Sequence, residues 1–399
     1  MKKSGQARSR QATAGPLLTA LLLAALSLAG APAFAGKRTP AAPAFAAVIE
    51  REVPAIMQEA NIKGVAIGLI VHGELAYAKG FGFADHAGTR AVTPDTVFVA
   101  ASLSKPIAAW VTERLVRDGK VALDQSVADI VTPWPLAASK FDQRAITFRH
   151  LLSHTAGTTL GGYQGWLDYA ELPTLEESLA GKTNGRGAVE LSAPAGAKFN
   201  YSGGGYTLMQ LAIERRTGRK YVDLAQELLF QPLGMKHTSV AMTPALLADA
   251  AQGHGDDGSP VPMRYYAEQA PSTLTTTLSD FALWMRASMD AAKGERDSLL
   301  SRAAITEMYT TAKLSEPRAP QEAVYGLGHF IEPQPDSTTA VGHDGRNQAG
   351  FRAKFLMRPH SGDGIVFFSN SRSGLALDRI VCLWAADAAK VEGQANCGK

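Results

Sequence analysis

Strand-like segments occupy both ends of this 399-residue chain, and helical segments fill its middle. Residues 65–71 are apolar and branched, and residues 75–83 continue in strand-like fashion after the turn at His72-Gly73, which is typical of a β-hairpin. Toward the C-terminus, strand-like runs recur at residues 325–331, 339–343, 351–357 and 364–369. We therefore predict an α+β fold. One antiparallel sheet forms from both ends of the chain, flanked by helices, and a mostly helical lobe is inserted at about residues 90–310.

Apolar residues at helical spacing predict the helices of this fold. The first begins near Phe45, and the last covers residues 375–389. Helices within the insertion are predicted at residues 147–157, 206–217, 221–229 and 279–291. The folded domain then runs from residue 44 to 390, followed by a C-terminal tail at 391–399.

The first 35 residues have the layout of a secretory signal peptide. A basic start precedes an apolar run at residues 17–28, and Ala33-Phe34-Ala35 forms a small-x-small cleavage site. The apolar run is too short to span a bilayer. We expect cleavage after Ala35, a flexible start at residues 36–43, and a secreted or periplasmic protein with no membrane span after cleavage.

Charge and composition narrow the range of partners. The formal charge of the chain is +3, and the predicted signal peptide carries four positive and no negative side chains, which leaves −1 for the mature protein. A chain without a basic excess has no electrostatic footprint for nucleic acid. With 46% hydrophobic and 19% charged residues, the composition is ordinary for a soluble globular protein.

The cysteines and two of the histidines raise the questions of a disulfide and of a metal site. Cys382 and Cys397 can form a disulfide in an exported protein, which would hold the tail against the last helix, or can stay as two free thiols. His150 and His154 have metal-ligand spacing, but no glutamate follows His150 directly and no further ligand motif appears. We interpret both as packing and hydrogen-bonding residues and predict no metal site.

The chemistry of the chain is concentrated in residues 98–109, which hold its single Ser-x-x-Lys, Ser102 and Lys105. Pro106 is tolerated only near a first helical turn, so we expect a helix to begin close to Ser102. Lys105 then lies one turn away and can reach the serine hydroxyl. A serine becomes a nucleophile when a neighbouring base takes its proton, and a lysine can be that base if burial lowers its pKa.

A second stretch, Tyr201-Ser202-Gly203, precedes a predicted helix. A tyrosine at such a position can point into a cleft and shuttle a proton, given a lowered pKa beside a lysine. It can equally be a core tyrosine with a backbone partner. The glycines from Gly203 to Gly205 lack the spacing of a phosphate loop, so we predict a tight turn. In a nearby loop, Tyr163 and Trp166 can line the cleft or form a small separate core.

The third stretch is His343-Asp344-Gly345 on a predicted strand. Alternation along the strand places His343 and Gly345 on one side and Asp344 on the other. Gly345 would let a substrate backbone come close. His343 would bind a carboxylate, support Tyr201, or serve only as a structural strand residue.

Five motifs in order carry a resemblance that spans roughly residues 45–390. They are Ser-Leu-Ser-Lys, Arg-His-Leu-Leu-Ser-His-Thr-Ala-Gly, Tyr-Ser-Gly, Gln-Pro-Leu-Gly-Met and His-Asp-Gly. The chain resembles the serine β-lactamase and penicillin-binding-protein superfamily. More narrowly, it is similar to the branch that holds class C β-lactamases, D-alanyl-D-alanine carboxypeptidases and family VIII esterases.

The resemblance implies a role for each matched residue and no metal or other cofactor. Ser102 is the nucleophile that is acylated, Lys105 its base, and Tyr201 a second acid and base. His343 and Gly345 occupy the position of the family's Lys-Thr-Gly strand. The oxyanion hole consists of the backbone N–H groups of Ser102 and Arg346.

Two departures from the family pattern determine which substrate class we expect. Gly203 stands where β-lactamases have an asparagine, and His343 stands where they have a lysine. The resemblance therefore implies an esterase or D-amino-acid peptidase first, with a β-lactamase or penicillin-binding protein second. A non-catalytic cell-wall or peptide-binding sensor is the alternative of a different class.

Overall fold

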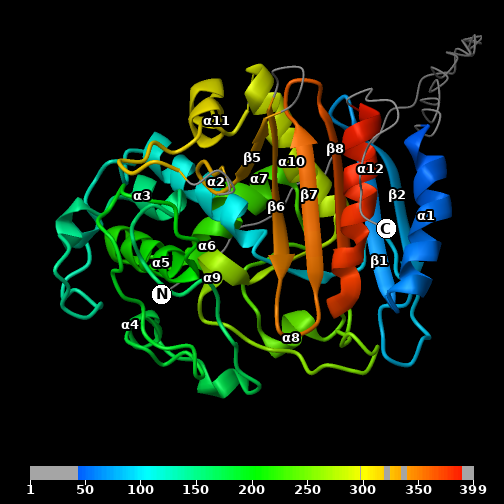
Figure 1. Cartoon of the computed structure of the whole chain (residues 1–399), viewed down its shortest axis with the longest axis horizontal. Helices are drawn as coiled ribbons and strands as arrows, with labels where there is room; N and C mark the ends of the chain where they lie inside the picture. The colour runs from blue at the N-terminus through cyan, green and yellow to red at the C-terminus, as the bar shows by residue number, and fades with distance from the viewer. Residues whose placement is uncertain (1–43, 297, 319–323, 334–338, 389–399) are drawn as a thin grey trace, which may run out of the picture. The chain divides into compact units, whose positions relative to one another are not determined.

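The computed structural model describes residues 44–296, 298–318, 324–333 and 339–388 (Figure 1). The predicted signal peptide, the start at 36–43 and the tail at 391–399 lie outside these residues. The described residues belong to one compact unit. Within the described ranges, no helix combines the length and the apolar character needed to cross a membrane.

A six-stranded antiparallel sheet is built from both ends of the chain, as predicted (Figure 1). Its order is β2-β1-β8-β7-β6-β5, so the N-terminal β1 pairs directly with the C-terminal β8. The strands are β1 (Gly64–Val71), β2 (Glu74–Gly82), β5 (Phe330–Pro333), β6 (Thr339–Arg346), β7 (Arg352–Arg358) and β8 (Asp363–Ser369).

The strand predicted at residues 325–331 is wrong in its start, because β5 begins only at Phe330. The preceding backbone turns away from the sheet. Leu327 N–H donates to Met308 O, and Gly328 N–H donates to Leu152 O. These donors bind the helical part of the molecule, so they cannot pair with β6.

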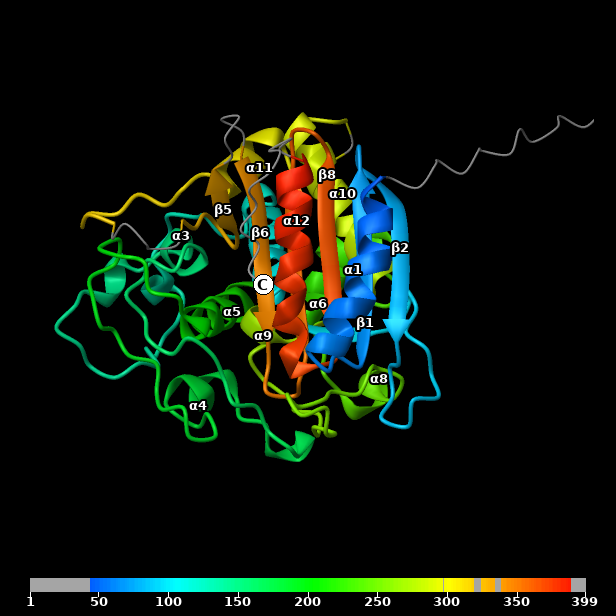
Figure 2. The same cartoon turned by 45° about the vertical axis from the view of Figure 1, so that its right-hand side comes forward.

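Helices cover both faces of the sheet. On one face, α1 (Phe45–Glu59) and α12 (Asp378–Ala388) lie beside each other (Figure 2). Ile49 of α1, Ile365 of β8 and Ile380 of α12 meet there in one apolar cluster. The other face packs against α10 (Leu278–Lys293). Cys382 on α12 is disulfide-bonded, and its expected partner Cys397 lies outside the described residues, so the pairing stays a prediction.

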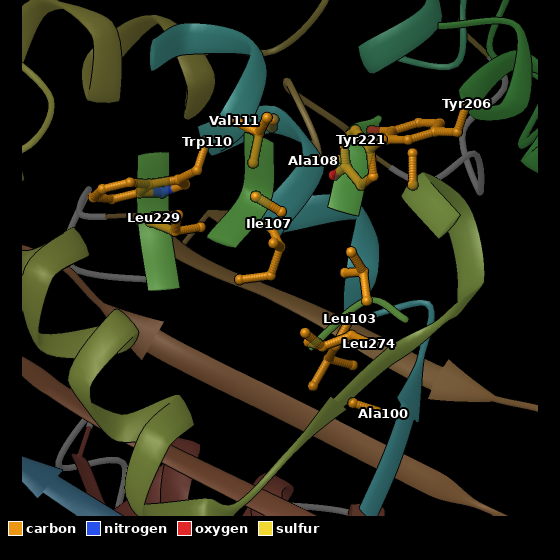
Figure 3. Close-up of a cluster of buried hydrophobic side chains, with 14 of the residues drawn as sticks. Ala100, Leu103, Ile107, Ala108, Trp110, Val111, Tyr206, Tyr221, Leu229 and Leu274 are labelled. Carbon is orange, nitrogen blue, oxygen red and sulfur yellow. The ribbon is translucent and has the colours of Figure 1, made fainter. Parts of the chain in front are cut away.

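The chain between β2 and β5 is mostly helix and loop. Its elements are β3 (Phe98–Ala101), α2 (Ser104–Arg117), α3 (Phe148–Leu152), α4 (Leu175–Leu179), α5 (Gly203–Thr217), α6 (Tyr221–Ala225), α7 (Gln231–Leu233), α8 (Pro244–Leu247), α9 (Gln269–Ser272), β4 (Leu274–Thr276) and α11 (Arg302–Met308). Helix α2 runs through the core of this part and is buried on nearly all sides. Figure 3 draws some of its core side chains, among them Ile107, Trp110 and Val111. Burial on every side fixes the position of this helix, and with it the residues at its start.

The glycine run at the start of α5 corrects one prediction. Gly203 to Gly205 form the first helical turn and not a separate tight turn. Ser202 caps the helix, because its Oγ accepts the Gly205 N–H at 2.9 Å. A Cβ on Gly204 would lie 2.5 Å from Val189 Cγ2, so close packing, and not turn geometry, requires the glycine.

Candidate active site

The junction between β3 and α2 presents Ser102. Ala101, the last residue of β3, has φ of 50°, a left-handed conformation that costs a residue with a side chain on the order of 1 kcal/mol. Leu103 caps α2, and the first helical residue is Ser104. Ser102 therefore lies in the sharp turn just ahead of the helix, which begins two residues after the predicted start. Backbone strain of this kind is concentrated at functional sites.

Lys105 lies directly behind this serine. Its Nζ is 3.2 Å from Ser102 Oγ and 2.9 Å from the carbonyl oxygen of Pro271 in α9. Burial lowers the pKa of Lys105 to about 7, against the opposing effect of the Asp344 carboxylate. At neutral pH a large fraction of the amine is therefore unprotonated, which is the state that a general base requires.

Tyr201 completes the group at the start of α5. The Lys105 Nζ lies 4.8 Å from the centre of its ring, and its hydroxyl hydrogen-bonds with Ser102. The predicted lowering of its pKa is wrong, because burial raises the pKa of Tyr201 and the hydrogen bond with Ser102 only partly offsets this. The phenol thus keeps its proton at neutral pH, so Tyr201 can donate a proton more readily than accept one.

His154 holds Tyr201 in place. The two ring centres are 4.2 Å apart, and His154 Nδ1 accepts the N–H of Ser202 at 3.0 Å. His150 is occupied by the capping box that begins α3, together with Thr147. These contacts agree with the interpretation of both histidines as packing and hydrogen-bonding residues. No group of potential metal ligands occurs in the part of the chain that the structure describes.

His343 lies behind the wall of the cavity and does not line it. Its Nε2 is 3.0 Å from the hydroxyl of Tyr325, and its ring centre is 6.1 Å from that of Tyr201. Burial lowers the pKa of His343 well below its usual range, so the ring is neutral and offers no charge to a carboxylate. Of the roles left open for His343, support of the tyrosine fits these contacts.

Gly345 also takes a different place from the one expected. A Cβ at Gly345 would overlap the carbonyl oxygen of Ala100, so the glycine admits the backbone of β3. It is absent from the lining of the cavity. Gly203 is also absent from the lining. A Cβ added at Gly203 would lie 3.4 Å from the ring of Tyr163.

The backbone of Arg346 is directed toward the site by the alternation of β6. Asn347 N–H donates to Phe351 O on the β7 side, so the N–H of the preceding residue points to the opposite edge. Strand β5 pairs with β6 only as far as Gly342 and leaves this edge uncovered. The Arg346 N–H thus points away from β7, and Arg346 and Ser102 line the same cavity, an arrangement compatible with the predicted place of this N–H in the oxyanion hole.

These residues open into a cavity of about 560 Å³. Its lining comprises Ala101, Ser102, Lys105, Leu160, Gly161, Gly162, Tyr163, Arg186, Tyr201, Tyr266, Ser272, Phe330, Asp344, Arg346, Asn347 and Gln348. Asp344, which strand alternation assigned to the far side, lines the cavity and forms an ion pair of 2.8 Å with Arg346. Sequence reasoning also missed Arg186, which lies in an irregular loop without any motif. Tyr163 lines the cavity and Trp166 does not.

The family model for beta-lactamase matches residues 49–389 of the chain. The chain belongs to the beta-lactamase family. The predicted resemblance to the serine β-lactamase and penicillin-binding-protein superfamily is therefore confirmed.

Curated relatives of this beta-lactamase-family chain differ in what they are named for. Penicillin-binding protein 4 of Amycolatopsis lactamdurans is 30% identical over 219 residues, 52% of this chain and 54% of the relative. Esterase EstB of Burkholderia gladioli is 28% identical over 238 residues, 56% of this chain and 58% of the relative. The chain spans a little over half the length of both relatives.

A solved structure shares the fold. The octameric penicillin-binding protein homologue from Pyrococcus abyssi superimposes with a TM-score of 0.71 at 24% sequence identity, over 88% of this chain and 78% of that one. An identity this low supports the fold alone. Together with the sheet and helices described above, it confirms the predicted α+β architecture.

Proposed function

We propose that this beta-lactamase-family protein is an exported serine hydrolase that forms a covalent acyl-enzyme on esters or D-amino-acid peptides. One observation carries the proposal. A lysine whose pKa burial lowers to about 7 lies 3.2 Å from the hydroxyl of Ser102, in a sharp turn at the wall of a cavity. A serine beside an unprotonated amine is an activated nucleophile.

Acylation follows from the geometry. Ser102 Oγ forms a bond with the carbonyl carbon of the substrate, and its proton passes to Lys105 Nζ. The carbonyl electron pair moves to oxygen, and the N–H groups of Ser102 and Arg346 stabilise that charge. The bond to the leaving group then breaks. The leaving atom takes a proton from Tyr201, which the Lys105 ammonium replaces.

Deacylation uses the same groups in reverse. A water oxygen attacks the acyl carbon and the water proton passes to Tyr201, which gives its own proton to the neutral Lys105 Nζ. The bond between that carbon and Ser102 Oγ breaks, and the serine recovers its proton. The products are a carboxylic acid and the free enzyme, with no cofactor consumed.

The lining of the cavity supports the choice of substrate. Arg186 and Arg346 contribute positive charge, and Asp344 offsets one of them, so a substrate that carries a carboxylate is favoured. His343 is neutral and Gly203 has no amide to offer. Esters and D-peptides are therefore our leading substrates, and β-lactams, which also carry a carboxylate, are the second class, since relatives are named penicillin-binding protein and beta-lactamase.

The test is intact mass spectrometry of the protein after mixing with p-nitrophenyl butyrate, a D-alanyl-D-alanine peptide or a penicillin. We expect an acyl adduct and turnover of the ester or the peptide. Ser102→Ala should lose the adduct and on the order of 10³-fold or more in turnover, because the attacking oxygen is gone.

Ser139→Ala, which removes an exposed serine away from the cavity, is the matched control and should behave as the wild type. Turnover by Ser102→Ala at the wild-type rate would refute the proposal. Lack of any adduct with all three compounds would favour a non-catalytic sensor. Rapid loss of the penicillin without a lasting adduct would favour a β-lactamase.

A further inference from the structure

A second cavity, of about 950 Å³, lies on the opposite side of the segment that supports Tyr201. Ser153 and Thr155 line it, whereas His154 between them packs on Tyr201 in the wall of the catalytic cavity. The far side of the second cavity is formed by α11 and the chain that follows it. None of its lining residues takes part in the proposed reaction.

Positive charge dominates this second cavity. Arg302 and Lys313 line it, both are exposed, and neither has an ion-pair partner among the described residues. Arg149 and Glu307 also line it, but they neutralise each other across 2.6 Å. Two uncompensated cations facing one cavity favour an anionic ligand.

The hydroxyl groups of the cavity restrict the ligand further. Thr306 donates to Arg302 O at 2.8 Å, and Thr310 donates to Thr306 O at 2.7 Å. Ser153 donates to Arg149 O at 2.8 Å and is paired with Thr155 Oγ1 at 2.9 Å. Thr306 and Thr310 each donate their proton to a backbone carbonyl, so they offer the cavity acceptor lone pairs. A matching ligand must bring hydrogen-bond donors. Charged amines are disfavoured beside the two cations, so the donors of the ligand are neutral, a condition that hydroxyl groups meet.

We propose that this cavity binds a sugar that carries a phosphate or a carboxylate group. The anion would pair with Arg302 and Lys313, and the sugar hydroxyls would donate to Thr306 and Thr310. The volume is within the range of about 300–1,000 Å³ that is usual for small-molecule sites. This inference does not depend on the proposed hydrolase activity.

Calorimetric titration of the wild-type protein with four probes tests the inference. The probes are glucose 6-phosphate, glucuronate, glucose and inorganic phosphate. At least one of the two charged sugars should saturate the protein below about 10 mM, and glucose and phosphate should each bind at least ~10-fold more weakly. Comparison of the two charged sugars identifies which anion the site takes.

The double variant Arg302→Gln/Lys313→Gln should weaken binding of the charged sugar at least ~10-fold, because both cations are removed. Its matched control is Lys140→Gln/Lys236→Gln, which removes two exposed positive charges outside both cavities and should leave binding unchanged. Equal binding by the Arg302→Gln/Lys313→Gln variant, or an equal loss in the control, would overturn the site.

The variant Thr306→Val/Thr310→Val tests the hydroxyl contacts separately. It keeps the shape of both side chains but removes the lone pairs, so the charged sugar should lose its advantage over inorganic phosphate. Thermal melting checks that each variant is folded. The proposal fails if neither charged sugar saturates the wild-type protein, or if phosphate alone binds as tightly as the sugar.

Discussion

At the scale of single residues, the balance of burial and charge at Lys105 decides when the site can work. The unprotonated amine is the active form, so kcat/KM should rise with pH through about 7. Asp344 opposes the effect of burial, because its negative charge favours the ammonium. Asp344→Asn removes that charge, so the rising limb of the pH profile should move to lower pH.

The measurement is kcat/KM for one ester between pH 5 and 9, about two pH units on either side of the expected limb. Asp249→Asn, a change outside the cavity, should leave the limb near its wild-type position. A limb that stays fixed in Asp344→Asn, or moves to higher pH, would contradict the assignment of Lys105 as the base.

A separate prediction concerns Tyr201, because its phenol is proposed to protonate the leaving group. Tyr201→Phe keeps the ring contacts with His154 and Lys105 but removes the proton donor. Turnover of a D-peptide, whose amine must leave protonated, should fall on the order of 10²–10⁴-fold. Turnover of a p-nitrophenyl ester should fall much less, since p-nitrophenolate leaves without a proton.

A steady-state comparison of both substrates checks this. If the ester and the peptide lose activity equally in Tyr201→Phe, the hydroxyl acts through its hydrogen bond with Ser102 and not by protonating the leaving group.

Local spacing made part of the site predictable. Ser102 and Lys105 are three positions apart, so their contact needs only the geometry of one turn, and Tyr201 followed from its motif. Asp344 and Arg186 could not be placed in this way. Alternation says which side chains share a face, but the end of β6 beyond β5 has neighbours on both faces, and only the packed structure shows which face opens into the cavity.

At the scale of elements, α2 carries an acidic side chain in an environment that opposes its charge. Burial raises the pKa of Glu113 to about 7, with a smaller contribution from Glu307 and a partial offset by Arg149. Its Oε1 has no hydrogen-bond partner among the described residues. The folded state therefore binds the proton more tightly than the unfolded state. Its contribution to stability is lost as pH rises from about 4.5 to about 7.

Glu113→Gln keeps the shape and removes the charge. At pH 8 the variant should be more stable than the wild type, by up to roughly 3 kcal/mol, and the difference should vanish near pH 4. Denaturant unfolding at the two pH values measures it. Glu295→Gln, an exposed glutamate outside α2, serves as the control. A Glu113→Gln protein that is less stable at pH 8 would show that the carboxylate has a favourable partner.

Helices and strands with a clear period were predictable, and their ends were not. The predicted strands at residues 339–343 and 364–369 fall within β6 and β8, and the one at 351–357 matches β7 with its start one residue too early. The strand at 325–331 failed because Leu327 and Gly328 have apolar or small side chains suited to a strand, but their N–H groups bind Met308 and Leu152. Such long-range partners leave no local signal in the sequence.

At the scale of the whole molecule, one apolar cluster that stabilises the fold is separate from the catalytic cavity. The apolar cluster between the sheet and α1 and α12 includes no residue of the cavity lining. Ile49→Ala, in the centre of this cluster, should destabilise the protein by about 2–5 kcal/mol through lost burial and a new void. It should leave kcat unchanged in protein that is folded.

Urea unfolding and kcat per folded molecule are the two measurements. Glu59→Ala, on the exposed side of the same helix, should change neither by much. A fall in kcat for fully folded Ile49→Ala would mean that this side of the sheet influences the site.

The architecture as a whole was open to prediction because strands cluster at the two ends of the sequence. The shape of the cavity was not, since its wall comes from loops such as the one that carries Arg186. Their paths depend on packing against α5 and the chain near Tyr266, which no periodicity records.

The pairing of β1 with β8 also means that a strand made early in synthesis pairs with a strand made near its end. Lys63 N–H and Ser371 Oγ, which hydrogen-bond in the finished protein, are 308 positions apart. At a synthesis rate of about 5–20 residues per second, the β1–β2 hairpin waits roughly 15–60 seconds for its central partner. During that wait one edge of β1 is unpaired and open to association with other chains. The chain is thus most exposed to aggregation before its last strand emerges, and a chaperone that binds the hairpin would act in that interval.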